Sequence, residues 1–90
     1  MYADVALRLG LSPQELERQS LRLFLRQQLR LVESQLLGLA RKYGVQTVTE
    51  LDKLVQKGQI HEAEAFEDYF ELDYLEAQRT TLLESLQELA

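Results

Sequence analysis

Few residues in this sequence could hold a metal ion or carry out catalysis. His61 is the only histidine, and cysteine is absent. On a helix, His61, Glu64 and Asp68 would share one face, because residues three and four positions apart are neighbours there. Their order does not match the Glu-x-x-His pattern of di-iron helical bundles, and acids near a helix start also interact favourably with the helix dipole. We therefore predict no metal site at these three residues.

Other enzymatic signatures are missing as well. The sequence contains no glycine-rich phosphate loop and no nucleophile with a recognisable base partner. We therefore expect no cofactor and no enzymatic activity.

Four arginines recur at intervals of four residues and form a basic stripe: Arg18, Arg22, Arg26 and Arg30. Such a stripe is typical of contacts with nucleic-acid phosphates. However, the formal net charge of the chain is −5, and aromatic residues do not alternate with the arginines. Residues 1–45 carry a net charge of +3 and residues 46–90 a net charge of −8. Ion pairing with the acidic last helix, or simple exposure to solvent, is therefore the favoured explanation, and nucleic-acid binding is the alternative.

The most distinctive stretch is residues 62–76, EAEAFEDYFELDYLE, in which seven acids alternate with large apolar side chains. Aromatic anchors dominate the binding energy of many protein interfaces, and carboxylates around them steer association toward a basic surface. An ordinary amphipathic helix with its acids in water is the alternative. We favour a surface that binds a basic partner protein.

These residues must be positioned by helices, whose ends the sequence marks clearly. Ser12, Pro13 and Glu15 form a capping box with proline at the first helical position, and Gly44 suits the other end. A second, short helix begins after Thr47 and ends at Gly58. The expected elements of the single domain, residues 1–90, are a short N-terminal segment (1–11), a long helix (12–43), a short helix (47–58) and a long helix (61–89). The sequence leaves open whether residues 1–10 form a helical turn or a short strand.

The first long helix carries an apolar seam with steps of three and four residues, typical of a coiled coil. The seam consists of Leu21, Leu25, Leu29, Val32, Leu36, Leu39 and Tyr43. Leu16, Leu23 and Leu37 project from nearly the opposite side, so one neighbouring helix cannot cover every leucine. Scattered exposed leucines are the simple alternative. We predict that the seam forms a core or a dimer interface.

These features predict an all-α protein: a long, coiled-coil-like antiparallel helical hairpin with a short helix at the bend. We expect two hairpins to pair into a four-helix bundle as a homodimer. Whether the long helices pair within one chain or between chains stays open. The sequence shows no signal peptide and no apolar run of about 18 residues, so we expect no membrane association and a cytoplasmic location.

Several segments resemble known proteins. LGLSPQELERQSLRLFLRQQLR resembles the N-terminal part of small prokaryotic VapB-like antitoxins. RKYGV, TVTELDKLVQKGQI and EAFEDYFELDYLE resemble, in that order, small helical partners encoded beside ribonuclease-type toxins. The resemblance covers residues 7–76. Many such antitoxins begin with a DNA-binding module such as a ribbon-helix-helix, whereas residues 1–10 here give at most one short strand.

The resemblance implies a type II antitoxin that neutralises a cognate toxin by direct binding, with the acidic aromatic segment covering a basic, RNA-handling surface. By position, it assigns the partner-binding role to Phe66, Asp68, Tyr69, Phe70, Asp73 and Tyr74. The hypothesis is therefore a non-enzymatic protein-binding module, an antitoxin. The alternative is a self-associating structural coiled-coil protein.

Overall fold

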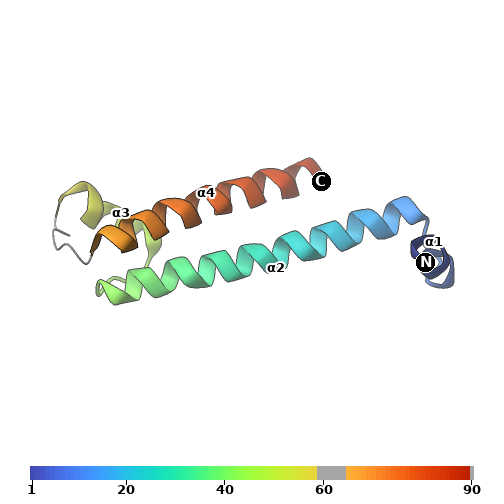
Figure 1. The fold of residues 1–90 in the computed structure, drawn as a ribbon, viewed down its shortest axis with the longest axis horizontal. Helices are drawn as coiled ribbons and strands as arrows, with labels where there is room; N and C mark the ends of the chain where they lie inside the picture. Colours follow the sequence, from blue (N-terminus) through green and yellow to red (C-terminus); the bar gives the residue numbers. More distant parts are fainter. Residues whose placement is uncertain (59–64, 90) are drawn as a thin grey trace.

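The protein is helical in the computed structural model, which describes residues 1–58 and 65–89 (Figure 1). Four helices follow one another along the chain: α1 (Tyr2–Arg8), α2 (Pro13–Lys42), α3 (Val48–Gln56) and α4 (Ala65–Leu89). The described residues contain no strand, so the prediction of an all-α fold is confirmed. The molecule is elongated, with extents of 56 × 20 × 19 Å, and α2 runs along its longest axis.

The helix ends lie where local sequence signals predict them. The Ser12 hydroxyl accepts a hydrogen bond from the Glu15 amide at 3.1 Å, and Thr47 does the same for the Glu50 amide. Each hydroxyl satisfies one of the backbone donors that a helix start leaves unpaired. Beyond the other end of α2, Gly44 takes a left-handed φ of 76°, which a residue without a Cβ adopts at little cost. The predicted starts of α2 and α3 therefore coincide with observed caps.

The first residues form a helix rather than a strand. α1 spans Tyr2–Arg8, and only Ala6 is buried within it. The chain turns at Gly10, and the Leu11 amide donates to the Ala6 carbonyl at 2.9 Å. This turn places α1 against the beginning of α2, at the end of the molecule opposite α3 (Figure 1).

The two long helices lie side by side and run in opposite directions (Figure 1). At one end, Tyr43 just after α2 donates a hydrogen bond to Asp68 at the start of α4. At the other end, Arg18 near the start of α2 donates to the Leu89 carbonyl at the end of α4. The connection through α3 therefore returns the chain along α2, and the two helices of one chain pack on each other.

The hydrophobic core lies in the half of the molecule that contains α3. It consists of Val32, Leu36, Leu39, Ala40, Leu51, Leu72 and Leu75. α3 contributes Leu51, whose side chain is only 1% exposed. In the other half, α1 packs against the beginning of α2, and Leu21 is 44% exposed. The end that contains α3 is therefore the better packed of the two.

The predicted seam of α2 faces α4 and the core. Val32, Leu36 and Leu39 are buried, whereas Leu25, Leu29 and Tyr43 are half-buried. The packing of this one chain thus occupies most of the seam. Among the helices that the structure describes, none is long and apolar enough to cross a membrane.

Candidate functional site

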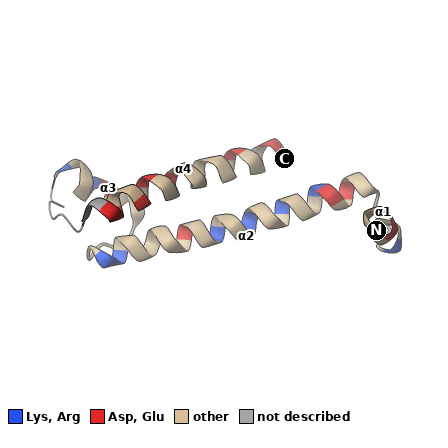
Figure 2. Cartoon of the chain, in the orientation of Figure 1, with Lys and Arg blue, Asp and Glu red and all other residues tan. Residues whose placement is uncertain are grey.

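Charged residues are distributed unevenly over the two long helices (Figure 2). Basic residues at the end of α2 lie at the same end of the molecule as the acids that open α4. Further along, Glu33 of α2 forms an ion pair with Arg79 of α4, with 3.6 Å between Oε1 and Nε. The basic and acidic halves of the sequence therefore contact each other within one chain.

Part of the arginine stripe binds the end of α4. Arg18 donates to the Leu89 carbonyl at 2.6 and 3.0 Å, and Arg22 donates to the same oxygen at 3.1 Å. The last carbonyls of a helix have no partner within the helix, and positive charge there complements the helix dipole. These two arginines therefore cap α4, which is a structural role within the chain.

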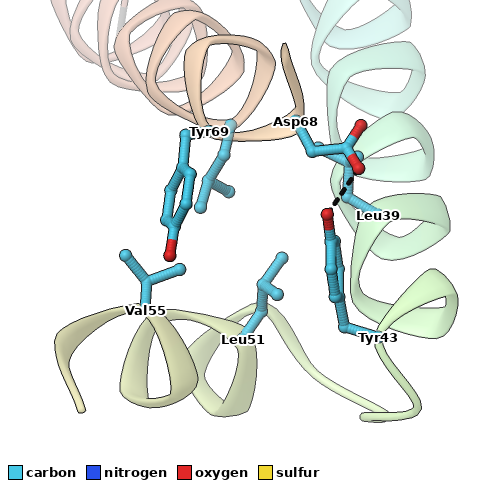
Figure 3. A pocket seen from close by; sticks show the side chains of 7 residues that line it. Leu39, Tyr43, Leu51, Val55, Asp68 and Tyr69 are labelled. Atoms are coloured by element: carbon cyan, nitrogen blue, oxygen red, sulfur yellow. Dashed lines mark hydrogen bonds between the residues drawn. The ribbon is translucent and has the colours of Figure 1, made fainter. Parts of the chain in front are cut away.

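The acids and aromatics proposed for partner binding divide into inward and outward groups. Asp68 faces α2, where its carboxylate lies 2.7 Å from Lys42 Nζ and accepts a hydrogen bond from the Tyr43 hydroxyl (Figure 3). The hydrogen bonds from Lys42 and Tyr43 lower the pKa of Asp68 below its ordinary value. Asp68 thus locks the start of α4 onto the end of α2.

Tyr69 lies beside Asp68 and faces α3 (Figure 3). Its half-buried ring and Val55 line a cavity of about 10 Å³ together with core leucines. A cavity of this size holds at most one water molecule, so it is a small packing gap rather than a ligand site. Tyr69 therefore serves the packing of α3 against α4.

Three of the six proposed residues point outward. Phe70 is 73% exposed and Tyr74 is 62% exposed. Asp73 is exposed between them, as are Glu67 and Glu71 nearby. We call these five residues the acidic aromatic surface. The side chain of the sixth proposed residue, Phe66, lies outside the described part of the structure, as do His61 and Glu64.

Metal binding finds no support in the described residues. They contain no group of three or more His, Asp or Glu side chains arranged to hold an ion. Asp68, the described member of the considered trio, is bound to Lys42 and Tyr43 instead.

A second acidic contact joins α3 to α4. Burial raises the pKa of Glu76 to about 7, and the neighbouring carboxylates of Asp52 and Asp73 add to the shift. A neutral Glu76 is tolerated beside Asp52, whereas two charged carboxylates repel each other. The contact between α3 and α4 is therefore sensitive to pH near neutrality.

Sequence reasoning missed an open groove between α2 and α4. The groove has a volume of about 370 Å³. It is lined by Phe24, Gln28, Val32, Tyr74, Ala77, Gln78, Thr81 and Leu82. Phe24 is 56% exposed, although its side chain is large and apolar. Phe24 and Leu31 are one heptad apart and lie off the main seam, and this spacing is the sequence signal that could have indicated the groove.

The fold and these surfaces define a small all-helical protein with two long helices packed along each other and aromatic side chains left exposed. The family model described as the Uncharacterized protein MJ0235 family matches residues 1–90, so the chain belongs to that family. No curated protein and no solved structure matches the chain.

Proposed function

We propose that this protein is a helical hairpin that binds another protein chain through its acidic aromatic surface and does not act as an enzyme. The observation that carries the proposal is the exposure of Phe70 and Tyr74 on a helix anchored from its other side. Aromatic side chains have large apolar areas and few rotatable bonds, so they gain much on burial at an interface.

The internal contacts of α4 prepare this surface for a partner. Asp68 and Tyr69 hold the beginning of the helix against α2 and α3. Because they fix the backbone, Phe70 and Tyr74 are presented on a rigid element, which reduces the entropy lost on binding.

Charge supports a basic partner. Lys42 neutralises Asp68, but Glu67, Glu71 and Asp73 remain exposed around the aromatic side chains. Nearby carboxylates repel each other, and a basic partner surface would relieve that repulsion and accelerate association. The concrete form of the proposal is an antitoxin in a prokaryotic cytoplasm that covers the basic, RNA-handling surface of a cognate toxin. The support for this form is the resemblance of residues 7–76 to such proteins.

The test is co-expression with the product of the adjacent gene, followed by copurification and a growth assay. Phe70→Ala combined with Tyr74→Ala should abolish copurification and any relief of toxicity. Leu23→Ala is the matched control, because Leu23 is a 62% exposed apolar residue of α2. The proposal is wrong if the unmodified protein does not copurify with the product of the adjacent gene and does not relieve its toxicity. It is also wrong if the double variant binds that product as well as the control does.

Self-association is the second candidate, compatible with the first. Two hairpins would form a four-helix bundle and cover apolar side chains that one chain leaves exposed, including Phe24 and Leu31. Sedimentation at micromolar concentration tests it, and a strictly monomeric protein would refute it.

A further inference from the structure

The pair of helices α2 and α4 has two different sides. On one side, the groove exposes Phe24 of α2 and Tyr74 of α4. We call this side the open face and define it by Phe24, Gln28, Leu31 and Gly38 of α2 with Tyr74 and Gln78 of α4. No described helix covers it, because α1 meets α2 around Leu16 and Ser20, before Phe24, and α3 lies beside Leu39 and Tyr43.

The other side carries α3 and the ion pair between Glu33 and Arg79. Tyr69, which faces α3, is five residues from Tyr74, or about 140° around the helix at 3.6 residues per turn. Glu33, which pairs with Arg79, is nine residues from Phe24, or about two and a half turns, and so lies opposite it. The open face therefore points away from both α3 and the ion pair.

The middle of the open face carries no charged residue within the described helices. Between Arg18 and Arg41, the charged residues of α2 are Arg22, Arg26, Arg30 and Glu33. All four lie at least a third of a turn from Phe24 by helical spacing. Between Glu76 and Glu84 of α4, Arg79 is the only charged residue, and it pairs with Glu33. In a chain with 28% charged residues, a neutral strip of this length marks a surface suited to burial.

Gly38 is a second, independent sign of an external neighbour. Phe24, Leu31 and Gly38 are spaced by seven residues and therefore line one stripe of α2. A glycine inside a helix is destabilising relative to alanine. Nothing in the described part of the chain requires a glycine here, since a Cβ at Gly38 would meet no described atom within 4 Å. A small residue on an exposed stripe permits the close approach of a helix from another chain.

We infer that the open face binds the open face of a second copy of this chain and so forms a four-helix bundle. The middle of the open face is neutral and complements itself, and a charged partner would gain no ion pair at that middle part. A two-fold axis places the same patch on both subunits, as an isologous interface requires. From Phe24 to Gly38 the stripe is about 21 Å long at ~1.5 Å per residue. Across the 20 Å width of the molecule this gives roughly 400 Å² in projection, about half of the ~800 Å² of accessible surface per partner in stable interfaces, and the relief of interdigitating side chains adds to it.

This inference rests on the proposed self-association. Tyr74 belongs both to the open face and to the acidic aromatic surface, so the test uses Leu31, which lies outside the acidic aromatic surface. The experiment compares Leu31→Glu with Leu23→Glu by sedimentation over a range of micromolar concentrations. Both leucines lie on α2 with similar exposure, 59% and 62%, but only Leu31 lies on the open face. Leu31→Glu should weaken the dimer at least about tenfold, because burying an unpaired carboxylate costs several kcal/mol, whereas Leu23→Glu should not. A monomeric wild-type protein refutes self-association itself, whereas a wild-type dimer that Leu31→Glu leaves intact refutes only the assignment of the face.

Single cysteines provide a second readout, because the chain has no cysteine of its own. Gln78→Cys lies on the groove, and Thr80→Cys lies two residues away on the other side of α4. Maleimide labelling of Gln78→Cys should slow as protein concentration rises, while labelling of Thr80→Cys should not change. The reverse pattern would overturn the inference. Gly38→Gln gives a third readout: we expect a weaker dimer although glutamine favours helix, and unchanged association would show that no close approach occurs there.

Discussion

Asp68 offers the sharpest test of how α4 is fixed to α2. Its side chain is 13% exposed, contacts Lys42 Nζ at 2.7 Å and accepts the hydrogen bond of Tyr43. Asp68→Asn retains the shape of the side chain and removes its charge. A hydrogen bond to a charged group contributes about 1.5–3 kcal/mol. Asparagine can still accept one bond, and Lys42 is largely exposed to solvent, so we expect a loss of about 2 kcal/mol at pH 7.

The pH dependence follows from the lowered pKa of Asp68. A carboxyl whose pKa is lower in the folded than in the unfolded state stabilises the fold above its unfolded pKa. That stabilisation is lost as pH falls from the ordinary value of 3.8 through the lower folded pKa. The wild-type protein and Asp68→Asn should therefore differ most at neutral pH and converge in acid.

Urea unfolding followed by circular dichroism, at pH 7 and pH 3 and at one fixed protein concentration, measures the loss of stability in Asp68→Asn and its dependence on pH. A loss of ~2 kcal/mol corresponds to a decrease of roughly 8–16 °C in melting temperature for a domain of this size. Asp73→Asn is the control, because Asp73 is an exposed acid of the same helix. It should change stability by less than about 0.5 kcal/mol. Equal stability of wild type and Asp68→Asn at pH 7, or an equal loss at both pH values, would refute the role of the ionised carboxylate.

Three further changes test other contacts. The wild-type protein should lose stability as pH rises from 4.5 toward 7, because the raised pKa of Glu76 stabilises the fold only while this carboxyl is protonated, and its ionised form faces Asp52. Glu76→Gln should remove this loss. Urea titrations at pH 5 and pH 8 measure the difference, and the same pH dependence in both proteins would contradict it. Arg18→Ala should cost about 1–2 kcal/mol and increase amide hydrogen exchange in the last turn of α4, since the arginine binds the Leu89 carbonyl; unchanged exchange there would exclude the cap. Leu51→Ala should cost about 2–5 kcal/mol in thermal unfolding, because this side chain of α3 is fully buried in the core, and a cost below 1 kcal/mol would show that α3 is not part of the core.

The sequence predicts the helices well because their ends depend on neighbouring residues. Ser12 and Thr47 bind amides three positions away, and Gly44 adopts its left-handed conformation locally. α1 was ambiguous because its few apolar residues fit a helical turn or a strand equally well. Its helix is stabilised by packing against α2, which no local pattern contains.

The division of the acidic aromatic segment could not be predicted in the same way. Asp68 and Phe70 are two residues apart, and composition gives both the same expected role. Their roles differ because Lys42, 26 positions earlier in the sequence, meets Asp68 and leaves Phe70 in solvent. Only the placement of α2 and α3 around α4 decides which side of the helix remains for a partner.

The same physical argument separates the two apolar stripes of α2. Periodicity shows that a stripe is to be covered but does not show by which chain. The covalent connection decides, because a tethered helix acts at an effective concentration of order millimolar. α4 therefore takes the richer seam that contains Leu36 and Leu39, both buried. In the proposed dimer, a second copy binds the poorer stripe of Phe24, Leu31 and Gly38, and it must associate from dilute solution and with fewer large side chains. Self-association through the open face should therefore be of micromolar rather than nanomolar strength, and it should be lost on dilution while the packing of α4 on α2 persists.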